Sequence, residues 1–407
     1  MKADSATAIN PLQRHLTAKR WPARLLTLLL MTGLLTACLE DSKDSSSRNN
    51  PNTGPQTGQI TLTGIEGLSY QTESKTGTTD AKGRYGYLPG QTVTFTLGNL
   101  PLAEAIPARE FLTPMEFTYE QRQILNVGGV EDSGMTSHRV IEKFLASNNP
   151  ETINIMRMLM VLDQDQNASA DNPVQITQRT IDQINTFLTD HPDFELNFAD
   201  SPGVFARAPN REDRDEEWSD ANRLIQSLCF HPVGHELCEE PPSQEAIDQL
   251  KPASSSQTPS DEYLALVAKK EAIESARREI RDVNEEAVRD FLLEQTDLYK
   301  LKLERPFTLR PDTLTLRPGD TGLKELAIVK IGGPLELANL EVESKNQDTV
   351  IVHGYSAQTG TANFHLTTTA AHNDEATLLV NFKLPGDYRW YRKSLLVRVN
   401  ENAPGFQ

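Results

Sequence analysis

The run Thr92-Val93-Thr94-Phe95-Thr96-Leu97 alternates threonine with apolar side chains at every second position. A period of two is typical of a strand with one buried face and one face toward water. Similar alternation begins at Ile60 and Leu62, and the turn Leu88-Pro89-Gly90-Gln91 separates two such runs. The sequence therefore predicts a small antiparallel β-sandwich over residues 59–112.

Residues 303–407 return to the same alternating pattern after a long interval. Short apolar runs bounded by turn residues recur there, namely Thr349–His353, Ala362–Leu366, Ala376–Val380 and Ser394–Val399. Regular short strands with turn signals between them are typical of a sandwich of two sheets. We expect a C-terminal β-sandwich that is immunoglobulin-like in general appearance.

In residues 113–302 the apolar residues recur at the spacing of helices. Ile153, Met156 and Leu159 recur every three residues behind Pro150, and Thr177 is placed to cap the next helix. From Asp261 to Lys302 a narrow apolar stripe runs through dense Glu, Lys and Arg, which predicts one long charged helix. The predicted fold class is therefore α+β and multidomain, with a helical region between two sandwiches.

Two stretches resemble known families. The segment Gly77–Tyr87 is similar to the Thr-Asp-x-x-Gly-x-Phe/Tyr-x-Tyr turn of prealbumin-like sandwiches of the carboxypeptidase-regulatory-like group. More broadly, Gly64–Ile176 resembles a group of proteobacterial surface proteins and outer-membrane lipoproteins that carry no established reaction. In that group the β-module is followed by Thr-Pro-Leu and by Asn-Ile-x-Arg-x-Leu-x-x-Leu-Asp-x-Asp. This chain has Thr113-Pro114-Met115 and Asn154–Asp165 at those places, and Pro311–Gly319 resembles the opening strand of bacterial Ig-like modules.

The first 37 residues have the pattern of a secretion signal. Basic residues, ending with Arg24, precede the apolar run Leu25–Ala37, which is too short to span a bilayer as a helix. The run ends in Leu35-Thr36-Ala37-Cys38, which resembles a bacterial lipobox. We expect cleavage before Cys38 and acylation of its thiol and amine. An ordinary secretory signal with an incidental cysteine is the alternative.

Acylation would fix the compartment. Each buried methylene contributes about 0.8 kcal/mol, so two or more acyl chains hold a protein stably on a bilayer. Leu39, and not Asp, follows Cys38, which by resemblance to Gram-negative lipoproteins implies the cell outer membrane. Residues 38–58 are rich in Ser, Asn, Asp, Pro and Gly and indicate a flexible tether with a reach of roughly 25 Å.

The net charge excludes some partners. The leader carries five basic residues and one acidic residue, so the chain without it has a formal charge of −21, against −17 for the whole sequence. An acidic surface argues against nucleic acid as a partner and against peripheral binding to anionic lipid. The expected partners are the membrane, through the lipid anchor, and an envelope protein or a glycan.

Two cysteines remain besides Cys38. Cys229 and Cys238 form an even pair in an oxidising compartment and bracket a Pro/Gly loop, so we expect a disulfide. The alternative is a zinc site made by Cys229, His231, His235 and Cys238, which are residue types that bind zinc tetrahedrally. Their spacing matches no common zinc finger.

The segment after the Asn154 motif suggests a metal. Asp163, Asp165 and Asn167 place oxygen ligands at alternate positions, as a calcium loop begins, and Asp171 adds a further carboxylate. Position six is Ala168 and not Gly, and position twelve lacks the usual Glu. We therefore expect no cofactor and interpret this segment as a polar helix end in a solvated loop, with calcium at Asp163, Asp165 and Asn167 as the alternative.

No catalytic motif is present. The sequence lacks Gly-x-Ser-x-Gly, a phosphate loop and Gly-x-Gly-x-x-Gly. We therefore expect a non-catalytic binding or structural module. Because glycosidase carboxylates leave no local signature, a hydrolase with its site in the helical region is the alternative. A third reading is a structural spacer built on the charged helix.

Overall fold

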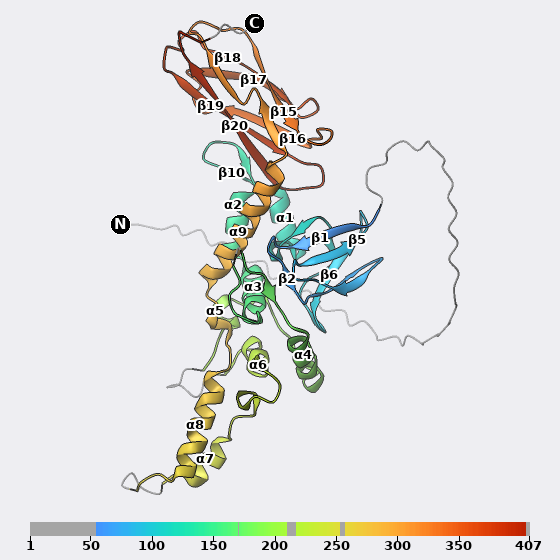
Figure 1. Cartoon of the computed structure of the whole chain (residues 1–407), viewed down its shortest axis with the longest axis vertical. Coiled ribbons are helices and arrows are strands. Elements are labelled where there is room, and N and C mark those ends of the chain that lie inside the picture. The colour runs from blue at the N-terminus through green and yellow to red at the C-terminus, as the bar shows by residue number, and fades with distance from the viewer. Residues whose placement is uncertain (1–53, 170, 210–216, 253–256, 404–407) are drawn as a thin grey trace, which may run out of the picture. The chain divides into compact units, whose positions relative to one another are not determined.

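The computed structural model describes residues 54–169, 171–209, 217–252 and 257–403, which belong to one compact unit, Pro51–Gln407. Helices and several β-sheets occur together in it, which confirms the α+β class (Figure 1). Among the described helices, none is both long and apolar enough to cross a membrane. The signal, Cys38 and most of the tether lie outside the described residues, so those assignments stay predictions.

The N-terminal sheets are built from short strands. β1 lies between β5 and β9, antiparallel to β5 and parallel to β9, and a second sheet has the order β4-β3-β6-β7 with β8 also paired to β6. The strands are β1 (Gln56–Ile60), β2 (Ile65–Glu66), β3 (Ser69–Thr72), β4 (Thr76–Thr78), β5 (Arg84–Tyr87), β6 (Thr92–Leu97), β7 (Leu100–Pro101), β8 (Ile106–Pro107) and β9 (Phe111–Leu112). In β6 the valine, phenylalanine and leucine are buried and the threonines are half-buried, as their alternation predicts.

The turn before β5 is held by side chains. The buried hydroxyl of Thr79 donates to the Ile65 carbonyl at 2.7 Å and accepts from the Leu68 N–H at 3.0 Å. Asp80 accepts the N–H groups of the residues two and four positions later at 2.9 and 3.0 Å. Gly83 takes a φ of 66°, which an L side chain rarely adopts. The Thr-Asp-x-x-Gly sequence therefore fixes this turn.

Helices follow, with two short strand pairs among them. The helices are η1 (Pro114–Glu116), α1 (Tyr119–Val127), α2 (Arg139–Asn148), α3 (Pro150–Val161), α4 (Gln178–Asp190), α5 (Pro202–Phe205), α6 (Asp220–Gln226), η2 (Glu236–Cys238), α7 (Gln244–Leu250), α8 (Asp261–Ser275), η3 (Ile280–Asp282) and α9 (Glu285–Glu304). β10 (Gly129–Val130) pairs with β11 (Thr136–Ser137), and β12 (Val174–Gln175) pairs with β2. Pro150 opens α3 and the Thr177 side chain caps α4, both as predicted.

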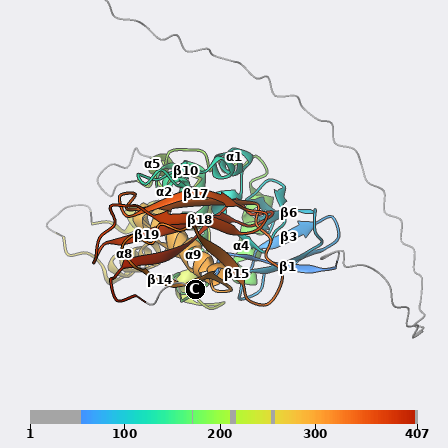
Figure 2. The ribbon, with the colours of Figure 1, turned by 90° about the horizontal axis from the view of Figure 1, so that it is seen from above.

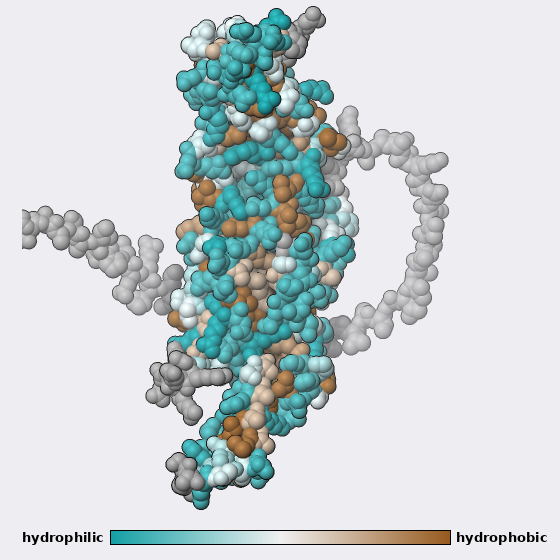
Figure 3. Space-filling model, turned by 60° about the vertical axis from the view of Figure 1, so that its left-hand side comes forward, coloured by the Kyte–Doolittle hydropathy of each residue, from teal (hydrophilic) through white to brown (hydrophobic). Residues whose placement is uncertain are grey.

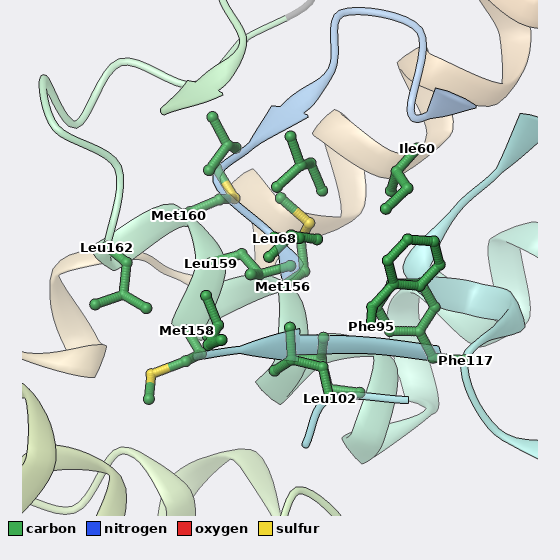
Figure 4. Packing of buried hydrophobic residues seen from close by; sticks show 14 of the residues in the cluster. Ile60, Leu68, Phe95, Leu102, Phe117, Met156, Met158, Leu159, Met160 and Leu162 are labelled. Carbon is green, nitrogen blue, oxygen red and sulfur yellow. The ribbon is translucent and has the colours of Figure 1, made fainter. Parts of the chain in front are cut away.

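The N-terminal sheets and the helices share one apolar core. Phe95 of β6 stacks on Phe117 at 5.7 Å between ring centroids, and Met156 and Leu159 of α3 are fully buried in the same cluster (Figure 4). α9 joins the cluster through Leu292, and Gln295 of that helix accepts backbone N–H groups from the turn after β1. The first sheets are therefore packed into the helical region.

The single long helix predicted over 261–302 is wrong. α8 ends at Ser275 and α9 begins at Glu285, with η3 between them. Arg277 donates to the carbonyls of Gln226 and Leu228, at the end of α6, and Arg278 donates to those of Val161 and Gln164, at the end of α3. Because carbonyls at a helix end have no partner within the helix, these guanidinium groups are held there and the chain bends. Asn284 then caps α9.

The C-terminal strands form two four-stranded sheets, here called the C-terminal sandwich, which Figure 2 shows nearest the viewer. The sheet orders are β13-β15-β18-β17 and β14-β20-β19-β16. The strands are β13 (Phe307–Arg310), β14 (Thr313–Leu316), β15 (Lys324–Lys330), β16 (Asn339–Ser344), β17 (Val350–Ser356), β18 (Thr361–Leu366), β19 (Glu375–Lys383) and β20 (Trp390–Val399). A second apolar core lies between them, with Phe364 and Phe382 fully buried.

Candidate functional site

Three places in the described residues bring chemically active side chains together. They are a buried charged cluster around Arg389, the acidic loop after α3, and the open edge of the C-terminal sandwich formed by β16 and β17.

The buried cluster centres on Arg389, which lies in the connection between β19 and β20 and is 1% exposed. Its guanidinium lies 3.5 Å from a carboxylate oxygen of Glu116 and 3.4 Å from one of Glu142. A third carboxylate, Asp387, lies 3.4 Å away. Tyr388 presents its ring 4.2 Å from the guanidinium carbon. Strand connection, η1 and α2 are thus joined through one cation.

His138 completes this cluster and has a defined tautomer. Its Nδ1 accepts the Trp390 N–H at 2.7 Å, and its Nε2 lies 3.5 Å from Glu142. Burial lowers the pKa of His138 well below its usual value, and Arg389 lowers it further, so the ring is neutral. Because Nδ1 accepts, the proton of a neutral ring is on Nε2, facing the carboxylate.

Glu142 is the group here with the altered acidity that catalysis would use. Burial raises its pKa to about 7, and the nearby Arg389 only partly offsets that effect. A general acid at neutral pH needs such a value. However, Glu116 and Glu142 are each 1% exposed, and neither lines the two cavities described below. The cluster has the arrangement of a structural junction.

The acidic loop holds the residues predicted as calcium ligands close together. Asp163 is fully buried and accepts the N–H groups of Gln175 at 2.7 Å and Asn167 at 3.0 Å. Burial raises its pKa to about 6. Asp165 accepts from Asn167 N–H and from the Asn172 amide, whose hydrogen bond lowers the pKa of Asp165. These oxygens already have protein donors, and calcium binding here stays a prediction.

The described residues contain no group of three His, Cys, Asp or Glu side chains arranged to hold a metal. Cys229 and Cys238 are joined as a disulfide, with their Cα atoms 5.4 Å apart, as the sequence predicted. Because both thiols are used in that bond, they are not free to bind zinc as the alternative required. His231 and His235 lie between the two cysteines in the sequence, and their rings stack with the centroids 4.8 Å apart.

The open edge of the C-terminal sandwich carries a β-bulge. Val352 of β17 pairs with Phe364 of β18, but the next pair is Gly354 with Asn363, so His353 has no opposite residue. A bulge of this kind redirects the side chains that follow it. Tyr355 consequently lies opposite the inward-facing Ala362, although it remains 50% exposed at the edge.

A cavity of about 230 Å³ opens between β16 and β17 at this bulge. Its lining includes Glu343, Gln347, His353 and Tyr355. A second cavity of about 260 Å³ lies beside β13 and is lined mainly by residues 308–312. Sequence reasoning missed the first cavity, because the bulge shifts Tyr355 out of the alternation that the strand pattern implies.

Comparisons with known proteins do not identify a family: no family model matches, and no curated protein matches. Among solved structures, the S-layer protein SbsC is similar over 24% of this chain and 13% of its own, at 13% identity and a TM-score of 0.18. An endo-fucoidan hydrolase of glycoside hydrolase family 107 covers 31% of this chain and 22% of its own, at 16% identity and a TM-score of 0.19.

An endo-β-1,4-mannanase from Thermotoga petrophila is similar over 28% of this chain and 24% of its own, at 15% identity and a TM-score of 0.16. The chain thus spans at most 24% of the length of these proteins. Likeness at these scores carries no argument about fold or function.

Proposed function

We propose that the protein is a non-catalytic lipoprotein of the Gram-negative outer membrane that binds an envelope glycan at the β16–β17 edge of its C-terminal sandwich. The leader and the Leu-Thr-Ala-Cys motif ending at Cys38 support the lipid anchor. The Thr79–Gly83 turn supports a carboxypeptidase-regulatory-like module for the first sheets, and the strand pattern of 303–407 supports an Ig-like module for the last.

The observation that carries the proposal is the cavity beside the bulge of β17. Within the described residues, no hydrogen bond or ion pair engages the side chains of Glu343, Gln347 or Tyr355, although all three line this cavity. An aromatic ring offers an apolar face to the C–H groups of a sugar, while a carboxylate and an amide can hydrogen-bond its hydroxyls. The lining therefore matches the chemistry of a carbohydrate.

The cavity's size limits the ligand. Sites for drug-sized molecules usually enclose about 300–1,000 Å³. A volume of about 230 Å³ is smaller, so we expect a single sugar unit, or the end of a chain, to be enclosed. The carboxylate of Glu343 favours a neutral or amino sugar over an acidic one, because like charges repel.

An added peptide strand fits this edge less well. Strand addition needs a regular row of backbone donors and acceptors along the edge strand. The shift between Val352 and Gly354 interrupts that row in the middle of β17. Bulges are one of the ways in which native sheets prevent edge-to-edge pairing. Glycan recognition by side chains is therefore favoured over strand addition.

The rest of the molecule supports a presenting role. The face shown in Figure 3 is predominantly hydrophilic, with separate apolar patches. Glu142, the carboxyl group whose raised pKa would suit a general acid, and its neighbour Glu116 are buried at a junction and line neither described cavity. The helical region then serves to hold the C-terminal sandwich on the tethered body.

The test is binding of two separate glycan sources to the full mature lipoprotein in detergent micelles. The probes are soluble peptidoglycan fragments and lipid-free core oligosaccharide from lipopolysaccharide, measured by calorimetry. We expect one of the two to bind, and Tyr355→Ala to weaken that binding at least ~10-fold, about 1.4 kcal/mol. Tyr119→Ala is the control, because Tyr119 is 57% exposed but lies on α1.

Binding of neither probe, or equal binding by wild type and Tyr355→Ala, would overturn the proposal. Release of new reducing ends from either probe during incubation would instead favour the hydrolase alternative. Both variants replace exposed tyrosines, so their unfolding midpoints should match wild type and exclude a loss of folding as the cause.

A further inference from the structure

We propose that His353 and His365 form an open binding site for one divalent transition-metal ion, such as Cu²⁺, Ni²⁺ or Zn²⁺, on the outer face of the sheet that ends in β17. The Nε2 atom of His353 lies 2.6 Å from the Nδ1 atom of His365. The two rings stack with their centroids 4.5 Å apart and 24° between their planes. Two imidazole nitrogens from neighbouring strands therefore face each other.

Strand register places both histidines on the same face. His365 of β18 lies opposite Ile351 of β17, and directly opposite residues point to the same side of a sheet. Their neighbours Phe364 and Val352 face the core between the sheets, so His365 faces outward. His353 is the bulge residue without an opposite partner, and its ring reaches back over His365.

The facing nitrogens determine what the pair can bind. In the ion-free pair one of them carries a proton and donates it to the other. A metal ion needs both lone pairs, so that proton moves to the second nitrogen of its own ring, and each ring stays neutral. Imidazole nitrogen suits copper, nickel and zinc, whereas calcium and magnesium prefer oxygen. The pair therefore selects a transition metal.

The geometry requires only a small adjustment. Zinc–nitrogen bonds are about 2.0–2.1 Å long, so two ligands at a tetrahedral angle lie about 3.3 Å apart. The rings must therefore separate slightly from 2.6 Å. His353 is exposed and His365 is half-buried, so the required rotation is open to His353.

The site is open and not closed. Among the described residues no third His, Cys, Asp or Glu stands close enough to complete a metal cluster. Water would fill the remaining positions, which implies an exchangeable ion and not a structural one. When bound, the ion would tie the edge strand β17 to β18 across its bulge. This inference does not depend on the proposed glycan function.

A second stacked pair in the same chain provides the control. His231 and His235 stack at 4.8 Å with 19° between their planes, but no hydrogen bond joins their ring nitrogens within the described chain. His235 instead accepts the Leu237 N–H through its Nδ1. The rings are stacked in both pairs, but of these two pairs only His353 and His365 have their ring nitrogens in contact.

The experiment is calorimetric titration of the full mature lipoprotein, purified without a histidine tag, with CuCl₂, NiCl₂, ZnCl₂ and CaCl₂ in separate runs. We expect about one Cu²⁺ per chain, bound more tightly than Ni²⁺ or Zn²⁺. His353→Ala and His365→Ala should each weaken binding at least ~10-fold. His231→Ala should leave it unchanged.

Electron paramagnetic resonance of the Cu²⁺ complex should show coupling to two imidazole nitrogens in wild type and to fewer in His365→Ala. Absence of transition-metal binding, or equal binding by wild type and His353→Ala, would overturn the inference. Tyr355→Ala should bind copper normally, which separates this outcome from failure of the glycan proposal. Calcium heat that persists in both histidine variants would report on the Asp163 loop instead.

Discussion

The two β-regions of the molecule share a sequence pattern but not a way of being stabilised. The N-terminal strands contribute Ile60, Phe95 and their neighbours to a core that also contains the side chains of α3 and α9. The C-terminal sandwich encloses its own core between its two sheets. The same alternation of side chains therefore occurs in one region whose apolar core is completed by helices and in one whose core is enclosed by its own strands.

Strand length explains the difference. The N-terminal strands have two to six residues, and four of the nine have two. In the C-terminal sandwich, β19 has nine residues and β20 has ten. Short sheets bury too little apolar surface to be stable alone and need a further layer against them. Here α3 and α9 supply that layer.

Arg389 links the two regions, and removing it should have the largest effect. Arg389→Ala leaves the buried Glu142 without its cation and leaves Glu116 with only Arg109, 3.6 Å away, and breaking a buried ion pair in this way costs about 3–5 kcal/mol. We expect a value near 5 kcal/mol at pH 8, above the pKa of about 7 of Glu142, because two carboxylates are then affected. Chemical denaturation followed by circular dichroism measures the loss.

Arg398→Ala is the matched control on β20. Arg398 pairs with Glu375 at the surface, where both side chains are more than half exposed, so a change within about 0.5 kcal/mol is expected. A combined variant with Arg389→Met, Glu116→Gln and Glu142→Gln should recover most of the loss, since no charge is then left buried. If Arg389→Ala and Arg398→Ala had equal effects on the free energy of unfolding, the buried cluster around Arg389 would not stabilise the junction between the two regions.

A pair of core substitutions tests whether the two cores unfold separately. Phe95→Ala and Phe364→Ala each remove a fully buried ring and should each cost about 4 kcal/mol. Phe95→Ala should destabilise the N-terminal sheets together with the helices, and Phe364→Ala mainly the C-terminal sandwich. Hydrogen exchange read by mass spectrometry locates the loss of protection.

The comparison between the regions would fail if Phe95→Ala exposed the N-terminal strands while α3 and α9 kept their protection. It would also fail if Phe364→Ala released all regions equally. Tyr119→Ala, which alters an exposed ring on α1, should change protection in neither region and serves as the control.

The disulfide should have a smaller effect than either core. Cys229 and Cys238 are nine positions apart, and closing a loop of that size is worth about 2–3 kcal/mol. The double variant Cys229→Ser and Cys238→Ser should lose that amount in thermal unfolding. Wild type under a reducing agent should show the same loss. A reduced wild type as stable as the oxidised protein would show that the loop is held by its other contacts.

Sequence reasoning predicted elements whose residues act locally. The alternation around Phe95 gave the strands, Pro150 and Thr177 gave helix starts, and the even cysteine count gave the bridge between Cys229 and Cys238. Each of these depends on neighbours in the chain or on simple pairing, so a single sequence contains the information.

The features that were missed depend on distant partners. Arg277 and Arg278 were predicted to be part of a charged helix, yet their guanidinium groups bind carbonyls 38 to 117 positions away and end that helix. Arg389 lies in the connection between β19 and β20, and its partner Glu116 is 273 positions away. A bulge at His353 likewise depends on register with β18 and leaves no mark in the strand itself.

The smallest net effect expected is a pH dependence at the junction between the regions, because two titrating groups act there in opposite senses. Burial raises the pKa of Glu142 from 4.5 to about 7, so the folded protein keeps a proton there that the unfolded chain releases. The stability that this group contributes is full below pH 4.5 and is lost as the pH rises toward 7, at no more than about 1.4 kcal/mol per pH unit.

His138 acts in the opposite sense, since its lowered pKa removes stability as the pH falls below 6.5. Glu142→Gln cannot ionise, so from pH 5 to pH 7 its denaturation midpoint should rise relative to that of wild type. Glu120→Gln, on the exposed face of α1, should follow the wild-type profile. Parallel profiles for wild type and Glu142→Gln would mean that Glu142 is already ionised beside Arg389, and the junction would then be an ordinary ion pair that does not respond to neutral pH.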